Sequence, residues 1–233
     1  MNLGEINDIL RYIANKTQGG NLPPARFQDI LNMASRMLLN DYLPSRYKEN
    51  PKLAYEETQK ISDDIYPFKR IPIDLPIDDN GRALYPADYV MCSSMRKVTT
   101  YKNSATPHES IRKQVPVNIL DDNAIAGVLT SRIVQPALNR PYATMYSDYI
   151  QFWPYNLQTV RFTYIRMPVK IIYGIIMTNN RPVYDPTTST ETDWPEICQN
   201  ALILKALSLM GINLREDQLQ KNVAELAAGG VSV

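Results

Sequence analysis

The sequence predicts an α+β chain in which N- and C-terminal helices form a bundle and an antiparallel β-domain is inserted between them. Apolar residues recur at helical spacing near both ends of the 233-residue chain, and β-branched and aromatic runs separated by turn residues fill the middle. This order favours one bundle with an insertion over two separate domains. The expected parts are helices at 1–67, a β-rich domain at 68–188, helices at 189–228 and a flexible tail at 229–233.

Three helices are predicted at the N-terminal end. The first covers 3–16 and the second 24–40, each with one apolar face, and together they are expected to form an antiparallel hairpin. A third opens with Asn50 as cap and Pro51 in its first turn, and it ends before Tyr66.

The C-terminal end predicts a helix that is apolar around most of its circumference. Asp193 is expected to cap this helix with Glu196 three residues later, and Gly211 is expected to end it in the left-handed conformation. Because the helix contains Lys205 and is only about 17 residues long, a position in a protein core is favoured over a membrane span. A further capped helix is expected at 213–228.

Strands are predicted from short β-branched and aromatic runs. The best defined is 159–166, where Val160, Phe162 and Tyr164 alternate with Arg161 and Thr163. The predicted strands are 115–120, 149–153, 159–166 and 171–177. Asp79, Asn80 and Gly81 indicate a turn.

Composition narrows the possible functions. The net charge of +1 provides no overall field toward nucleic acid or an acidic membrane, so any such contact must be local. Cys92 and Cys198 are far apart and lie in apolar sequence, which is typical of free buried thiols. No secretory signal pattern is recognisable at the N-terminus.

The sequence offers little for catalysis, and neither an enzyme nor a cofactor or metal is expected. The single histidine, His108, stands in a loop-like segment without the companions that a zinc site or a catalytic triad needs. Paired carboxylates occur at 63–64, 78–79 and 121–122. All three pairs are expected at element ends or turns, where aspartate binds the local backbone.

One basic segment stands out against the balanced charge. Five basic residues and a single acid, Glu109, lie in a strand, loop, strand pattern, and the basic residues are Arg96, Lys97, Lys102, Arg112 and Lys113. Repeated around a ring of identical subunits, such a loop would make a strongly basic annulus that attracts phosphate. A solvated loop is the simpler interpretation.

Tyrosine is abundant, with 15 residues beside 4 phenylalanines. Its apolar body and polar tip suit interfaces. A candidate subunit interface is the aromatic cluster that consists of Tyr142, Tyr146, Tyr149, Phe152, Trp153 and Tyr155. Core packing explains this cluster equally well.

Several short motifs, taken in order, resemble virion structural proteins of crAss-like bacteriophages. They include Leu84-Tyr-Pro-Ala-Asp-Tyr89, Asn139-Arg-Pro-Tyr142, Val160-Arg-Phe-Thr-Tyr-Ile-Arg-Met-Pro168 and Asp193-Trp-Pro-Glu196. More distantly, the chain is similar to the head-to-tail connector, or adaptor, proteins of short-tailed phages. The resemblance extends from about residue 55 to 228.

The resemblance implies a non-enzymatic ring of about twelve copies at the head–tail junction of a virion, assembled in the host cytoplasm. Its partners would be the portal, downstream tail or ring proteins and non-specific double-stranded DNA in the channel, with no membrane. The tail that would dock on the portal corresponds to Gly229, Gly230, Val231, Ser232 and Val233. Another virion ring or tail-tube component, or a non-viral β-domain binding module, are the alternatives.

Overall fold

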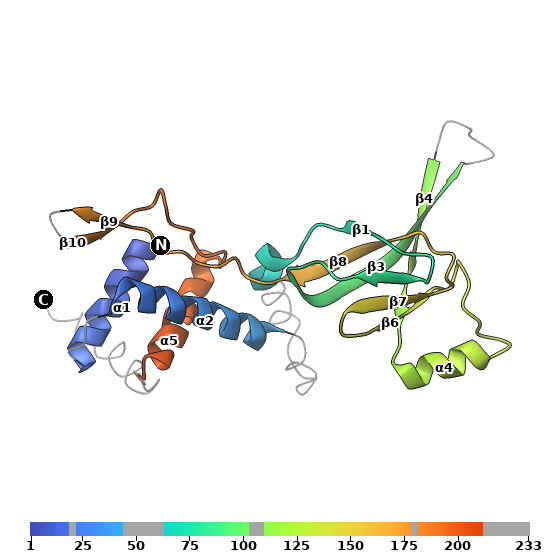
Figure 1. Ribbon diagram of the computed structural model, residues 1–233, viewed down its shortest axis with the longest axis horizontal. Helices are drawn as coiled ribbons and strands as arrows, with labels where there is room; N and C mark the ends of the chain where they lie inside the picture. Colours follow the sequence, from blue (N-terminus) through green and yellow to red (C-terminus); the bar gives the residue numbers. More distant parts are fainter. Residues whose placement is uncertain (19–21, 44–62, 103–109, 179–180, 212–233) are drawn as a thin grey trace, which may run out of the picture. The chain divides into compact units, whose positions relative to one another are not determined.

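The computed structural model describes residues 1–18, 22–43, 63–102, 110–178 and 181–211 (Figure 1). The chain is α+β with mainly antiparallel sheets. It divides into a helical unit, Met1–Pro67 with Pro168–Val233, and a β-rich unit, Phe68–Met167. Sequence patterning set the second boundary at 188, whereas the structure assigns 168–188 to the helical unit.

The helical unit contains α1 (Leu3–Gln18), α2 (Pro24–Tyr42) and α5 (Glu196–Leu209). α1 and α2 confirm the predicted ranges to within two residues at their C-terminal ends. α5 contacts both of them. The indole Nε1 of Trp194 donates to Ser35 Oγ over 2.8 Å, and Lys205 forms an ion pair with Asp41 at 2.6 Å. The predicted helix at 213–228 and most of the one after Asn50 lie outside the described residues.

The start of α5 differs from the prediction. Its N-cap is Pro195, without a side-chain cap, whereas Asp193 accepts a hydrogen bond from the backbone N–H of Val169 over 2.8 Å. The carboxylate therefore holds the incoming 168–170 segment instead of the helix. At the other end, Gly211 has a φ of 79°, which confirms the expected left-handed residue.

The backbones of Ile171 and Tyr173 bind α2, and between them Ile172 forms an isolated bridge with Thr190, so no regular strand begins at 171. The side-chain amide of Asn32 accepts from the N–H of Ile171 and donates to its carbonyl, both over 2.9 Å, and Gln28 Oε1 accepts from the N–H of Tyr173 over 3.2 Å. Because these backbone groups are occupied, the predicted strand at 171–177 is shortened to β9 (Ile175–Thr178), which pairs with β10 (Arg181–Tyr184).

The β-rich unit contains two four-stranded sheets. The first has the order β1-β8-β3-β4, with β1 at Ile73–Pro76, β8 at Thr159–Arg166, β3 at Tyr89–Lys102 and β4 at Ser110–Pro116. The second has the order β2-β7-β6-β5, with β2 at Arg82–Leu84, β7 at Tyr149–Trp153, β6 at Tyr142–Met145 and β5 at Asn118–Ile119. β5 pairs with β6 in parallel, so the expectation of purely antiparallel strands is corrected there.

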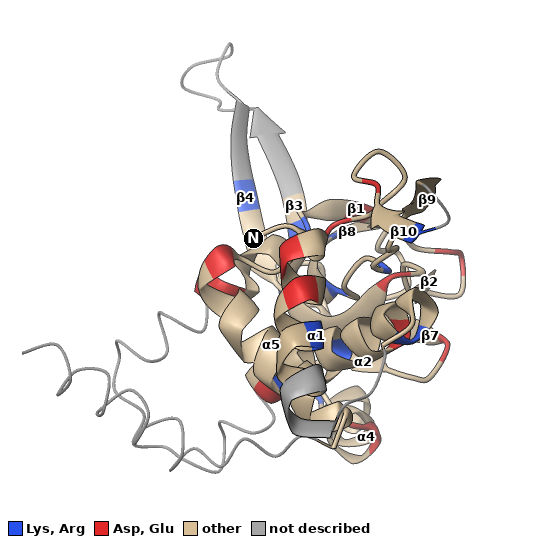
Figure 2. Ribbon diagram, turned by 90° about the vertical axis from the view of Figure 1, so that its left-hand side faces the viewer, with Lys and Arg blue, Asp and Glu red and all other residues tan. Residues whose placement is uncertain are grey.

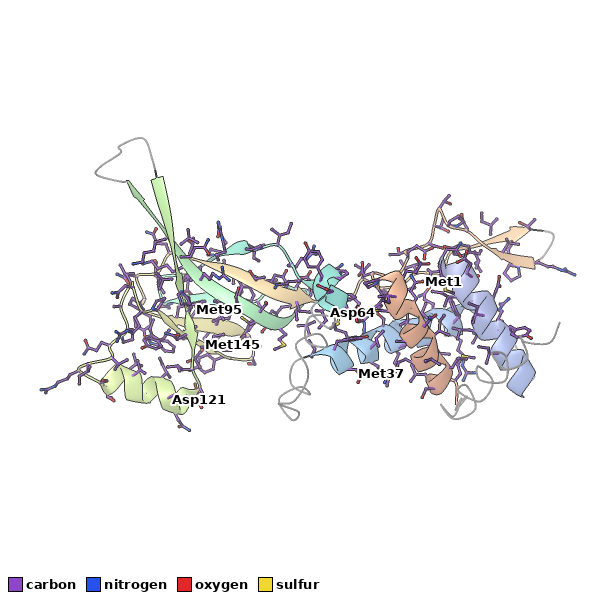
Figure 3. All side chains as sticks on the ribbon, turned by 180° about the vertical axis from the view of Figure 1, so that it is seen from behind. Met1, Met37, Asp64, Met95, Asp121 and Met145 are labelled. Carbon is purple, nitrogen blue, oxygen red and sulfur yellow. The ribbon has the colours of Figure 1, made fainter. Side chains whose placement is uncertain are left out.

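The core of this unit lies between the two sheets. Val160 and Phe162 from the first sheet pack with Ile150 and Phe152 from the second, and all four side chains are fully buried. The alternation predicted for β8 is confirmed, since Tyr164 joins the same cluster. Met95 and Met145 lie inside the unit among these strands (Figure 3).

A helix that sequence patterning missed, α4 (Asp122–Thr130), packs against β6. Its Ile125 contacts Tyr142 and Trp153. Asp121 caps it by accepting from the N–H of Ala124 over 2.7 Å, which agrees with the expectation that this acidic pair marks an element end.

Asp88 joins the first and last segments of the β-rich unit. Its carboxylate accepts from Arg70 over 3.0 Å and from the hydroxyl of Tyr164 over 2.7 Å, and its backbone carbonyl accepts from the N–H of Met167 over 2.7 Å. Burial raises the pKa of this carboxyl, but the hydrogen bonds from Tyr164 and Arg70 outweigh it and leave the pKa below its ordinary value.

Asp88→Asn is therefore expected to destabilise the β-rich unit at neutral pH, by an amount on the order of 1 kcal/mol because the site is partly exposed. Because the pKa of Asp88 is lowered in the folded state, its ionised carboxylate stabilises the fold at pH values above the ordinary aspartate pKa of about 3.9. This contribution is lost as the pH falls through the folded-state pKa. Denaturation curves should thus converge for variant and parent in acid. Asp74→Asn, which alters a more exposed carboxylate paired with Arg161, is the matched control and should change little. A constant difference across pH would contradict the assignment.

Candidate functional site

The predicted basic residues lie on one β-hairpin. β3 and β4 pair from Arg96 with Pro116 to Lys102 with Ser110, whereas β8 pairs with β3 only as far as Arg96. Beyond Arg96 the hairpin is therefore two-stranded among the described residues, and Figure 1 shows it extending past the rest of the sheet. We call residues 96–113 the basic hairpin.

The described basic side chains occupy two faces of this hairpin. Arg96 lies on one face, opposite Arg161, and donates to Gln114 Oε1 over 3.2 Å. Arg161 is itself paired with Asp74 at 3.1 Å, so the two guanidinium groups are separately partnered. By strand alternation, Lys97 and the exposed Lys113 share the opposite face. Figure 2 shows basic segments on both β3 and β4.

Lys97 differs from the expectation of a DNA-facing residue. Its Nζ donates to the carbonyl of Leu138 over 3.0 Å, and burial lowers the pKa of its ammonium. Lys97 thus anchors the loop before β6. The backbone of Lys102 and Arg112 lies in the hairpin, but their side chains are outside the described residues, as are His108 and the tail at 229–233.

The aromatic cluster separates into core and surface residues. Tyr142, Phe152 and Trp153 are buried within the β-rich unit, so they pack its core and do not form the predicted subunit interface. Tyr146, Tyr149 and Tyr155 retain exposed surface. A hydrogen bond with Asp122 raises the pKa of the Tyr146 hydroxyl.

The exposed aromatic residues lie beside an open groove at the β2 edge of the second sheet. The groove encloses about 530 Å³ and is lined by Pro76, Ile77, Asp78, Arg82, Leu84 and Tyr149. We call it the β2-edge groove. Tyr146 contacts Tyr149 with ring centroids 5.1 Å apart, and Tyr155 lies against Gly81 in the adjoining turn. The volume is within the usual range for ligand pockets.

Polar contacts fix the shape of the groove. The Arg82 guanidinium lies over the Tyr149 ring at 4.7 Å from its centroid, and Arg82 Nε donates to Gln151 Oε1 over 3.3 Å. Asp78 Oδ1 accepts from the N–H groups of Asn80 and Arg82, which closes the predicted turn. Sequence reasoning missed the groove, although the turn signal at 78–81 marks one wall of it.

The chemistry available elsewhere is limited. Among the described residues, no group of three His, Cys, Asp or Glu side chains could hold a metal ion. Within the same residues, no helix is long and apolar enough to span a membrane. Cys198 is buried, and burial raises the pKa of the half-buried Cys92 to about 11, so both thiols are poor nucleophiles at neutral pH.

No family model matches this chain, and no curated protein matches it either.

Proposed function

We propose that this chain is a non-enzymatic structural protein of a virion, a connector ring that lies beneath the portal, joins capsid to tail and extends the DNA channel. In this proposal the N- and C-terminal helices form one bundle that contacts the portal, and the basic hairpin faces the DNA. The observation that carries the proposal is the basic hairpin itself, because a nearly neutral chain concentrates basic residues on a two-stranded arm. The contacts of α5 with α1 and α2 support the bundle.

Sizing by light scattering, with and without a portal protein, tests the ring. A large closed oligomer, or a monomer that assembles only when a portal is present, is the expected result. A chain that stays monomeric under both conditions would contradict the proposal and would favour a β-domain binding module, the alternative that the β2-edge groove supports.

Replacement of Arg96, Lys102, Arg112 and Lys113 by glutamine is expected to weaken double-stranded DNA binding while folding is retained. The slope of log affinity against log salt should fall by about 0.9 for each phosphate that the variant no longer neutralises. Lys97 is left unchanged because it anchors Leu138. The control replaces four exposed basic residues of the helical unit, which are Arg26, Arg36, Lys170 and Arg181. Equal reductions of DNA affinity in both variants would contradict the assignment of the basic hairpin to the DNA channel.

A further inference from the structure

The loop between α4 and β6 is a preformed apolar projection. Ser131 Oγ accepts hydrogen bonds from the N–H groups of Ile133 and Val134 over 3.2 and 3.1 Å. Farther along, Ala137 and Arg140 exchange two backbone hydrogen bonds, and Lys97 holds the carbonyl of Leu138. These bonds stabilise residues 131–140, yet Ile133 is 89% exposed. An ordered loop thus presents a large aliphatic side chain to solvent.

This projection and the β2-edge groove lie at opposite edges of one sheet. The sheet order is β2-β7-β6-β5, and the groove adjoins β2. The loop ends beside β5, where the N–H of Asn118 donates to the carbonyl of Pro141 over 3.0 Å. The two surfaces of one copy therefore adjoin different edge strands of the sheet and do not share residues, and a head-to-tail contact uses two such different surfaces.

The β2-edge groove and the 131–140 loop both expose apolar side chains. The groove presents Leu84, which is 74% exposed, together with Ile77 and the ring of Tyr149. Besides Ile133, the loop presents Val134 and Leu138, both exposed. Burial of such side chains contributes about 25 cal/mol for each Å² removed from water.

The charges of the two surfaces are complementary. Residues 129–141 contain Arg132 and Arg140 and no acid, and both arginines are exposed. The turn at the groove carries Asp78 and Asp79. Arg82, which also lines the groove, is already engaged by Tyr149 and Gln151. Two acids and one arginine leave the groove and its adjoining turn with a net negative charge, which is opposite in sign to that of the loop.

We propose that the 131–140 loop of one copy of this chain docks into the β2-edge groove of the next copy, with Ile133 filling the groove. Such a contact uses two different surfaces of each chain, so it repeats from copy to copy and closes into a ring when the rotation allows. This contact would be the subunit interface of the proposed connector. The contact itself does not depend on the connector function, and only the closure into a ring rests on it.

Disulfide trapping tests the pairing directly. Ile133→Cys and Leu84→Cys are prepared as separate full-length proteins and mixed under mild oxidation. We expect a disulfide-linked heterodimer in the mixture and no linked dimer of either variant alone. The native thiols interfere little because Cys198 is buried and Cys92 has a raised pKa. If no heterodimer forms, or if Leu84→Cys forms homodimers, the groove has a different occupant and the proposal is overturned.

A second test measures assembly of the whole chain. Ile133→Asp should shift sedimentation toward the monomer and leave the thermal unfolding midpoint unchanged, because the side chain makes little contact within its own copy. Ile71→Asp is the matched control, since Ile71 is 82% exposed in the same unit and lies outside both surfaces. Normal assembly of Ile133→Asp would overturn the contact while leaving the connector function intact. A trapped heterodimer from a chain that never forms a closed ring would support the contact and contradict the connector.

Discussion

Replacing Phe162 with alanine is expected to lower the free energy of unfolding of the β-rich unit by about 3–5 kcal/mol. Phe162 is fully buried in the core between the two sheets. Its ring lies 5.8 Å from that of Tyr89 and 5.4 Å from that of Tyr164. β8 is paired on both sides, by β1 and β3, so the strands around the cavity have little freedom to close it.

Tryptophan fluorescence can follow this unit separately. The chain has two tryptophans, Trp153 in the β-rich unit and Trp194 in the helical unit. In a Trp194→Phe background, denaturant titration of Trp153 fluorescence reports the β-rich unit alone. Ile71→Ala, a truncation at an exposed position, should change the free energy by less than about 0.5 kcal/mol. A loss for Phe162→Ala as small as that of this control would show that Phe162 does not hold the sheets together.

Gly81→Ala is expected to cost about 2–4 kcal/mol of stability and to distort the β2-edge groove. Gly81 has a φ of 74°, where a side chain is strained. A Cβ there would lie 2.8 Å from the carbonyl oxygen of Phe152 and 2.6 Å from a ring carbon of Tyr155. The tyrosine ring could move, but the Phe152 carbonyl belongs to β7, which is paired with β2 and β6.

The glycine of α4 provides a matched control for this substitution. A Cβ on Gly127 would meet nothing within 4 Å, and the residue is helical. Gly127→Ala should therefore stabilise by up to about 1 kcal/mol, through the helix propensity of alanine. The same fluorescence titration distinguishes the two variants. Equal stability for both would show that the turn at 78–82 adapts, and that the groove is not rigidly formed.

The sequence alone determined the elements whose signals are local. Runs of β-branched and aromatic residues defined β7 and β8 at their observed bounds, and helical periodicity defined α1 and α2. The turn at Gly81 followed from its residue types. The basic hairpin was also predictable, because its charges are close in sequence and a hairpin keeps sequence neighbours together.

Other features were decided only by tertiary contacts. Asn32 occupies the backbone of Ile171 and shortens a predicted strand, and Asp193 binds Val169 instead of capping α5. In each case a side chain meets a backbone group that is more than twenty residues away along the chain. Local propensity contains no information about such partners, so it assigns these residues to the nearest regular element.

For the two surfaces of the proposed contact, too, the sequence predicted some features and tertiary contacts decided the others. Residue types marked Asp78 to Gly81 as a turn and residues 142–155 as aromatic, but only the pairing of β2 with β7 brings Leu84 beside Tyr149 and forms the groove. Composition predicted a DNA-facing charge at Lys97, and the fold directs that side chain to the carbonyl of Leu138. Periodicity and composition describe a residue and its neighbours in the chain. Which face of a strand is covered, and by what, depends on elements that fold back from far along it.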